Sequence, residues 1–180
     1  LRTPNLDRLA DSGIRFENFF CASPVCSPAR ASILTGGIPS QHGIQDFLEA
    51  GNSDLLPNDD RVVRYLEGQS SYVQALADSG YECGLSGKWH MGDSAAPQMG
   101  FTYWNVQATG GGDYNKAPMF TDGPLYYTDR YVTDVITDNA LGFLERNSGS
   151  EQPFSLNVHY TAPHAPRHRG QHPSELFDNY

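Results

Sequence analysis

The sequence predicts an α/β protein, a three-layer α/β/α sandwich built on a mostly parallel sheet. Two helix-to-strand transitions carry this prediction. Residues 70–79 form an amphipathic pattern that ends at Gly80 and leads into a short apolar strand at 81–85. A second amphipathic helix, 129–147, precedes the apolar strand 154–160. Because strands that alternate with helices favour parallel pairing, we expect helices on both faces of one sheet.

The chain begins with a predicted helix over residues 3–12. Thr3 suits the N-cap, Pro4 takes the first helical position and Gly13 ends the helix. Apolar and polar side chains then alternate over residues 14–17, which predicts a strand.

Cys26 lies at the N-terminus of the next predicted helix, which runs through Leu34 to a stop at Gly36. Pro28 suits the first turn, because its ring fixes φ and its missing N–H would have no partner there. Free N–H groups and the positive end of the helix dipole favour an anion beside Cys26. Arg30, about one turn further on, can direct its guanidinium at the same anion. The pattern predicts a nucleophile held over an anion-binding cradle.

The two longest segments between elements are predicted to be loops. Residues 45–61 are polar and contain Gly, Asn and Asp. Residues 93–128, with three glycines at 110–112, are predicted to be an irregular excursion that lines an active site. Aromatic side chains of this excursion could stack on a sugar or an aryl ring, although aromatic residues in loops more often only pack. They are Trp104, Tyr114, Tyr126 and Tyr127.

Composition excludes several classes of protein. The chain has 180 residues, enough for one core, and a formal net charge of −9 without a basic stripe, which argues against nucleic-acid binding. No apolar run approaches the roughly 18 residues of a membrane span, and no leader pattern is expected. Three cysteines argue against a complete disulfide framework. Cys21 and Cys83 are expected to be small buried thiols.

Two ordered blocks carry a resemblance to a known family. Residues 26–36 match its Cys-x-Pro-x-Arg signature with a Thr-Gly end, and residues 80–90 match its second signature, which ends in Gly-Lys-x-His. Flanking segments fit as well: 3–10, 39–44 and 162–166. The chain therefore resembles the formylglycine-dependent type I sulfatases over nearly its whole length. The resemblance implies the alkaline-phosphatase-like version of the α/β sandwich.

The resemblance also implies a division of the chain. Residues 1–180 would be a partial sulfatase catalytic domain, cut at both ends, and this piece alone is expected to be inactive. Its parts would be a nucleophile loop, a second signature, an active-site excursion and a histidine loop, at residues 21–44, 80–92, 93–128 and 159–170 respectively.

Five side chains take catalytic roles by this resemblance. Cys26 would be converted to formylglycine (3-oxoalanine) by a formylglycine-generating or anaerobic sulfatase-maturating enzyme, and the aldehyde hydrate would attack sulfur. Arg30 and Lys88 would stabilise charge on the sulfate oxygens. His90 would accept the proton in the release step. His164, a substrate-binding residue together with Lys88, would help to protonate the leaving alcohol.

The remaining histidines are assigned less specific roles. His159 competes with His164, because strand alternation leaves open which of them faces the pocket. His42 is expected to support the nucleophile loop, and His168 and His172 are expected to be solvated.

The resemblance further implies a calcium ion, alternatively described as magnesium. Such hard cations prefer carboxylate and amide oxygens. The family's acidic ligands lie outside this chain, so Cys26, as formylglycine, is the metal contact carried over. The pairs Asp59-Asp60 and Asp178-Asn179 lie outside the family's motif context.

The expected function is that of a sulfuric ester hydrolase acting on a small-molecule or carbohydrate sulfate monoester. A phosphonate or phosphodiester hydrolase of the same superfamily and a non-catalytic sulfatase remnant remain as alternatives. The resemblance implies a periplasmic or secreted location in a bacterium.

Overall fold

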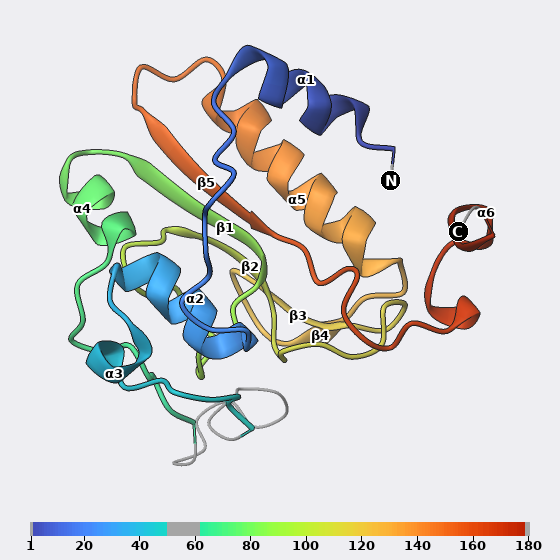
Figure 1. Cartoon of the computed structure of the whole chain (residues 1–180), viewed down its shortest axis with the longest axis horizontal. Coiled ribbons are helices and arrows are strands. Elements are labelled where there is room, and N and C mark those ends of the chain that lie inside the picture. Colours follow the sequence, from blue (N-terminus) through green and yellow to red (C-terminus); the bar gives the residue numbers. More distant parts are fainter. Residues whose placement is uncertain (1, 50–61, 179–180) are drawn as a thin grey trace.

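A five-stranded sheet lies at the centre of the molecule (Figure 1). The structure, a computed structural model, describes residues 2–49 and 62–178. The strands are β1 (Glu82–Lys88), β2 (Tyr103–Gln107), β3 (Pro118–Thr121), β4 (Tyr126–Tyr127) and β5 (Phe154–His159), in the order β4-β3-β2-β1-β5. β1 pairs in parallel with β2 and β5, whereas β3 pairs antiparallel with both β2 and β4. The α/β prediction is confirmed, and the sheet is mixed rather than uniformly parallel.

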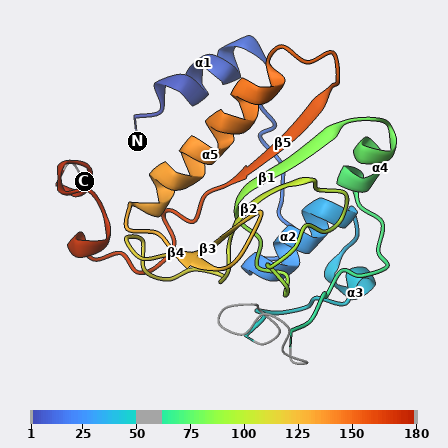
Figure 2. The same ribbon diagram turned by 180° about the vertical axis from the view of Figure 1, so that it is seen from behind.

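Alternate side chains of β1 point to opposite layers of helices. Cys83 and Leu85 join a core with helices α2 (Cys26–Thr35) and α4 (Tyr72–Asp78). On the other face, Ser86 donates to the Ile136 carbonyl of α5 (Val132–Asn147) at 2.8 Å. Figures 1 and 2 show the sheet between these two layers. This alternation follows from the two-residue repeat of a strand.

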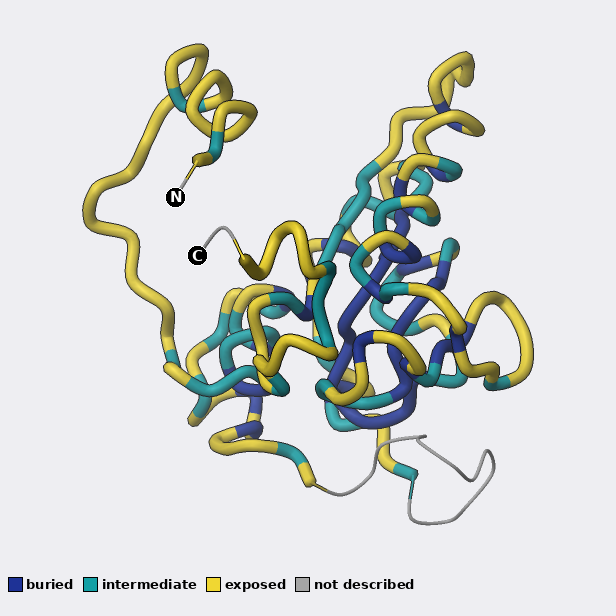
Figure 3. The backbone as a smooth tube through the Cα atoms, turned by 90° about the vertical axis from the view of Figure 1, so that its right-hand side faces the viewer, coloured by how far each residue is buried: buried dark blue, intermediate teal, exposed yellow. Residues whose placement is uncertain are grey.

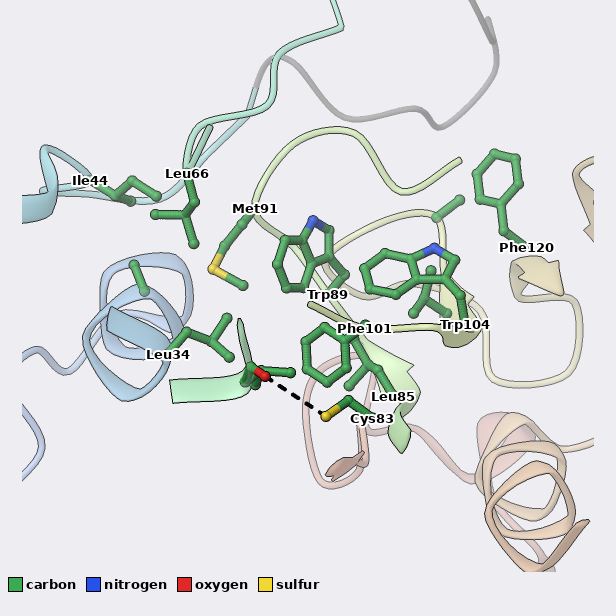
Figure 4. Close-up of a cluster of buried hydrophobic side chains, with 14 residues drawn as sticks. Leu34, Ile44, Leu66, Cys83, Leu85, Trp89, Met91, Phe101, Trp104 and Phe120 are labelled. Carbon is green, nitrogen blue, oxygen red and sulfur yellow. Dashed lines mark hydrogen bonds between the residues drawn. The ribbon is translucent and has the colours of Figure 1, made fainter. Parts of the chain in front are cut away.

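Aromatic side chains fill the core on the α2 side of the sheet (Figure 4). The Trp89 ring packs edge-on against Trp104, with centroids 5.2 Å apart, and against Phe101 at 6.4 Å. All three side chains are buried. Trp89 directly follows β1 between Lys88 and His90, so its burial anchors the segment that carries both of these polar side chains.

The strands β1 and β5 approach most closely at Gly87, which pairs with His159. A Cβ built on Gly87 would lie 2.1 Å from the His159 carbonyl oxygen, and Gly87 has φ +113°. A residue with a side chain would therefore push the two strand ends apart. The glycine allows the end of β5 to lie directly beside Lys88.

The predicted helices are confirmed, and their ends follow the capping signals. Helix α1 spans Pro4–Ser12 between Thr3 and Gly13. Helix α2 begins at Cys26 and ends at Gly36, whose φ of 72° is the left-handed conformation that glycine adopts readily. Ser71 caps α4 by accepting a hydrogen bond from the Gln74 N–H at 2.9 Å. The remaining short helices are α3 (Pro39–His42), a 3₁₀ turn (Arg169–Gln171) and α6 (Ser174–Phe177).

Two secondary-structure predictions are wrong. Residues 14–17 form no strand, because the segment finds no partner for a hydrogen-bonded ladder within the described chain. Phe19 and Phe20, just beyond it, are 85% and 84% exposed. Figure 3 shows this segment and α1 standing apart from the sheet. Conversely, the excursion 93–128 contains β2, β3 and β4, whose pairing with β1 and with one another overrides a Gly- and Pro-rich composition.

Smaller corrections concern individual residues. The strand predicted at residues 81–85 corresponds to β1, which continues to Lys88 instead of ending at Leu85. Leu144, which the amphipathic pattern over 129–147 predicts on the apolar face of the helix, is exposed in α5. Cys83 is buried as predicted, whereas Cys21 is exposed. Most of the predicted loop 45–61, including Asp59-Asp60, lies outside the described residues.

Candidate active site

Cys26 opens onto a cavity beside the carboxyl ends of β1 and β5. It is the first residue of α2 and is half-buried. The cavity has a volume of about 270 Å³ and is lined by Cys26, Ala29, Arg30, Ile33 and His159. Cys26 and Arg30 come from successive turns of one helix, as the spacing predicts. His159 comes from β5, 129 residues beyond Arg30, and only the sheet brings the two together.

The His90 ring lies within hydrogen-bonding distance of the thiol. Its Nδ1 lies 3.3 Å from Cys26 Sγ and 3.4 Å from Ser27 Oγ, and its Nε2 lies 3.2 Å from the Leu48 carbonyl oxygen. Because a carbonyl only accepts, Nε2 carries the hydrogen and Nδ1 presents its lone pair to residue 26. His90 adopts φ +57°, an unusual backbone conformation for a residue with a side chain. The surrounding structure thus holds this ring in a defined place.

Burial keeps His90 neutral. Desolvation is the main cause that lowers the pKa of His90 to about 4, and the positive charge of Lys88 lowers it further. The hydrogen bond to Leu48 acts in the opposite direction. At neutral pH the ring is therefore an unprotonated base directed at residue 26.

Lys88 and Arg30 are two cations beside the thiol, Lys88 buried and Arg30 half-buried. Lys88, the last residue of β1, is only 2% exposed. Burial lowers its pKa, its interaction with the Cys26 side chain raises it, and the Arg30 charge lowers it. Burial also lowers the pKa of Arg30 to about 10, so its guanidinium stays charged at neutral pH. Two cations without a carboxylate partner in the described structure create a positive site suited to an anion.

Arg30 is fixed by groups at the ends of β1 and β5. Its Nη1 donates to the Lys88 carbonyl oxygen at 2.9 Å and lies 3.1 Å from His159 Nδ1. His159 Nδ1 is also 3.1 Å from the same carbonyl oxygen. Of the two candidate histidines, His159 therefore lies on the cavity wall beside Arg30.

His164 lies at the same end of the sheet but has no hydrogen bond to the other predicted catalytic residues. It is exposed, and its Nδ1 lies 2.9 Å from the Ala165 carbonyl oxygen. A Cβ on Gly111 would be 2.9 Å from His164 Nδ1, and a Cβ on Gly110 would be 2.3 Å from His90 Cε1. The two glycines thus pack their bare backbone against both histidines.

The other histidines divide between structural and exposed roles. His42 is buried, its Nδ1 accepts from the Ile44 N–H at 3.2 Å, and its Nε2 lies 3.0 Å from Ser32 Oγ, so it supports helix α2 as expected. His168 is exposed, as predicted. His172, expected to be solvated, is half-buried, and its ring packs 4.6 Å from that of Tyr114.

The aromatic residues of the excursion split in the same way. Trp104 and Tyr114 are buried and serve packing, whereas Tyr126 and Tyr127 are exposed on the edge strand β4.

Sequence reasoning missed three contributors to the site: Ser27, the Leu48 carbonyl and Gly110. Ser27 is adjacent to Cys26 and Gly110 belongs to the glycine run, so both had a signal in the sequence. Nothing in the sequence indicates that a backbone carbonyl 42 residues away fixes the tautomer of His90.

A match to a family model identifies the family to which this chain belongs. The model described as Sulfatase matches residues 1–180. The chain belongs to the sulfatase family.

Curated relatives of this sulfatase chain include enzymes named for sulfated sugars. An N-acetylglucosamine-6-O-sulfatase of Bacteroides thetaiotaomicron is 34% identical over 194 residues, covering 100% of this chain and 32% of the relative. An ulvan-active sulfatase of Formosa agariphila is 31% identical, covering 100% and 34%. The chain therefore spans about a third of the length of these relatives.

Solved structures agree with the assigned fold. A structure described as a complex with its substrate D-glucosamine-2-N,6-O-disulfate has a TM-score of 0.72 and 34% identity, covering 99% of this chain and 33% of the other. A complex of Ps i-CgsB with a neocarrahexaose has a TM-score of 0.76 and 28% identity, covering 98% and 43%. Within the described residues, no helix is both long and apolar enough to cross a bilayer.

Proposed function

We propose that this chain carries the nucleophile and the anion-binding cations of a sulfuric ester hydrolase. One observation carries the proposal: residue 26 lies within hydrogen-bond reach of a neutral imidazole nitrogen, and two cations, the buried Lys88 and the half-buried Arg30, face it. A sulfate monoester carries its charge on non-bridging oxygens, so its cleavage needs fixed positive donors around a nucleophile. The segments 21–44 and 80–92 supply these groups.

Residue 26 fits the modification that the family relationship implies. The Cys26 side chain is half-buried and opens onto the cavity, so a maturating enzyme would act on it before or during folding and the product would face substrate. As formylglycine, its aldehyde would add one water to form a hydrate, and a hydroxyl of that hydrate would be the nucleophile in place of the thiol. The chain's own residues surround that position with an acceptor, His90 Nδ1, and with the charges of Arg30 and Lys88.

The roles of the other residues follow from their positions and, for His90, from its neutral ring. His90 holds a lone pair at neutral pH and takes a proton from residue 26. Arg30 and Lys88 hold the sulfate oxygens. His164, exposed at the same end of the sheet, protonates the leaving alcohol once substrate lies between it and the cavity.

The described residues do not fit a calcium or magnesium site. They contain no group of three or more His, Cys, Asp and Glu side chains placed to hold a metal ion. Asp178 instead pairs with Arg169. No step of the proposed reaction is assigned to a metal ion. The proposal places the acidic ligands outside the described residues and keeps residue 26, as formylglycine, as the contact from this chain.

The proposed substrate is a sulfate ester on a carbohydrate. The N-acetylglucosamine-6-O-sulfatase and the ulvan-active sulfatase support this class, since both relatives are at least 31% identical to the chain and cover all of it.

Two measurements test the proposal. After expression with a maturating enzyme, the mass of the Cys26 peptide should fall by the amount expected for replacing a thiol with an aldehyde. A longer protein that contains this chain and a set of metal-binding carboxylates should release sulfate from an aryl sulfate and from a 6-sulfated N-acetylglucosamine. It should be much slower on a matched aryl phosphodiester.

The chain alone should release no sulfate from either ester. A persistent thiol together with an inactive longer protein would identify a non-catalytic remnant. Faster cleavage of the phosphodiester would identify the other class of hydrolase.

A further inference from the structure

His159 is a half-buried polar side chain on the cavity wall, and the proposed reaction assigns no role to it. It is the last residue of β5 and pairs with Gly87 of β1, where the two strands lie close together. The position of its backbone is therefore fixed by the sheet. Its ring lines the same cavity as Cys26 and Arg30.

The Arg30 guanidinium has two hydrogen-bond partners among the described residues, and both are at this place. They are the Lys88 carbonyl oxygen, 2.9 Å from Arg30 Nη1, and His159 Nδ1, 3.1 Å from the same nitrogen. Arg30 Nε is buried without a partner in the described structure. The orientation of the guanidinium thus depends on these two contacts.

The chemistry of the three groups selects one tautomer of His159. Arg30 Nη1 carries two hydrogens and can give one to each acceptor if His159 Nδ1 presents a lone pair. With a hydrogen on Nδ1, the ring could donate to the Lys88 carbonyl oxygen 3.1 Å away, but the same N–H would face the Arg30 cation, and the second Nη1 hydrogen would have no acceptor among the described residues. A hydrogen bond from a charged donor is also stronger than one between neutral groups. The hydrogen of the neutral ring therefore lies on Nε2.

The ring stays neutral in these surroundings. Burial lowers the pKa of His159 to about 4, and the Arg30 charge acts in the same direction, while the Lys88 carbonyl opposes both. The charged or titratable groups nearest to it are Arg30 and Cys26 on α2 and Lys88 on β1.

We propose that His159 is an anion-binding residue of the cavity: its Nδ1 accepts from Arg30 and fixes the guanidinium, and its Nε2–H donates to a sulfate oxygen. Nε2 has no hydrogen-bond partner in residues 2–49 and 62–178, and the ring lies on the cavity wall. The remaining wall, formed by Ala29 and Ile33, is apolar and offers an anion no competing contact. The inference rests on the proposed anion-binding function of this cavity.

Binding of inorganic sulfate to the unmodified chain tests this role without any turnover. Three substitutions separate the two ring nitrogens. In His159→Asn the amide occupies the place of Nδ1 and the cavity donor is lost. In His159→Gln an N–H₂ group reaches the place of Nε2. His159→Leu removes both. Titration calorimetry should show sulfate affinity about tenfold weaker for Asn and Leu, the value of one hydrogen bond, and a smaller loss for Gln.

The control is His168→Asn, a change at an exposed histidine that should leave the affinity unchanged. Thermal unfolding of each variant shows that the fold is retained. Nitrogen NMR of the imidazole ring provides a readout that a purely structural role would not produce. At neutral pH, the hydrogen should be on Nε2, and its signal should shift when sulfate is added.

The proposal is overturned if the wild-type chain binds no sulfate, if Asn and Leu variants bind within about twofold of wild type, or if the hydrogen is on Nδ1. The last two outcomes would leave the hydrolase proposal standing, whereas a wild-type chain that binds no sulfate would also count against its anion-binding cations. A chain that binds sulfate through His159 but belongs to an inactive longer protein would contradict only the hydrolase. Normal turnover with unchanged sulfate binding in the variants would contradict only the role of His159.

Discussion

His90 Nδ1 lies 3.3 Å from Cys26 Sγ, while the opposite nitrogen of the ring is held by the Leu48 carbonyl. The two residues are 64 positions apart in the sequence. The ring joins the N-terminus of helix α2 to the segment after β1. Because its hydrogen is engaged with Leu48, the ring can only accept from residue 26.

Replacement of His90 by glutamine should separate its two functions. The Gln amide can still donate to the Leu48 carbonyl, but it provides no nitrogen lone pair at the position of Nδ1. In a longer, formylglycine-containing protein, we expect sulfate-release kcat to fall by roughly 10²–10⁴-fold, the usual contribution of a positioned base. The measurement is steady-state release of sulfate from an aryl ester.

The control for that variant is Ser27→Ala, which removes only the second, longer contact to Nδ1 at 3.4 Å. It should change kcat far less. Equal rates for the Gln variant and the wild type would show that His90 does not transfer the proton.

Stability should fall as pH is lowered from 6.5 to 5. The pKa values of His90 and His159 are about 4 in the folded chain, against 6.5 for an unperturbed histidine, mainly because both are buried. The unfolded chain therefore binds more protons in this window, and acidification favours unfolding. Each histidine contributes up to about 1.4 kcal/mol per pH unit.

Burial lowers the pKa of His42 as well, so it acts in the same direction. Denaturant unfolding at pH 6.5, 5.75 and 5 measures the slope. His159→Gln should make it shallower. A free energy of unfolding that stays constant over this window would show that the rings are not held neutral by burial.

Gly110→Ala should displace the His90 ring. The added Cβ would lie 2.3 Å from His90 Cε1, well inside van der Waals contact. We expect a loss of about 1–3 kcal/mol in the free energy of unfolding, as for other overpacked sites. Urea unfolding provides the measurement.

The matched variant is Gly142→Ala in helix α5, where the added Cβ meets nothing within 4 Å. There the better helix former should stabilise the chain by about 0.5–1 kcal/mol. If both alanine variants were equally stable, the glycine at 110 would not be required by the ring.

Ser32→Ala should lower the free energy of unfolding, because it removes the contact between helix α2 and His42. His42 Nδ1 accepts from the Ile44 N–H, so Nε2 carries the hydrogen and donates to Ser32 Oγ at 3.0 Å. Removal of the hydroxyl leaves a buried donor without a partner, which costs about 1–3 kcal/mol. Ser148→Ala, at an exposed serine, should stay within about 0.5 kcal/mol of wild type in the same urea titration. A Ser32 variant as stable as that control would contradict the assigned role of His42.

Local signals predicted the helices better than the strands. Gly13, Gly36 and Gly80 mark helix ends in the sequence and follow those helices in the structure, because a helix satisfies its hydrogen bonds within its own segment. A strand does not. The alternating residues 14–17 form no strand without a neighbour, whereas Pro118–Thr121 does so against β2 in spite of its composition.

The candidate site divides in the same way. The spacing from Cys26 to Arg30 places both on adjacent turns of one helix, and this could be predicted because the distance is fixed within that helix. The catalytic roles of Lys88 and His90 were expected from a resemblance of motifs and stay predictions, while the structure places both side chains beside Cys26. The sequence alone could not show whether His159 or His164 faces the cavity. His159 ends the strand and His164 lies in the loop that directly follows it.

By itself, the sequence determined the alternation of helices and strands, the ends of the helices, and the presence of a nucleophile and an arginine on one helical turn. These features depend on backbone preferences and hydrogen bonds between residues close in the chain. Only the tertiary structure decided which nitrogen of His90 faces Cys26 and which histidine contacts Arg30. Both depend on carbonyl groups and strand ends that the sheet brings together. A sheet forms only when segments distant in the sequence pair, so no single segment determines these contacts.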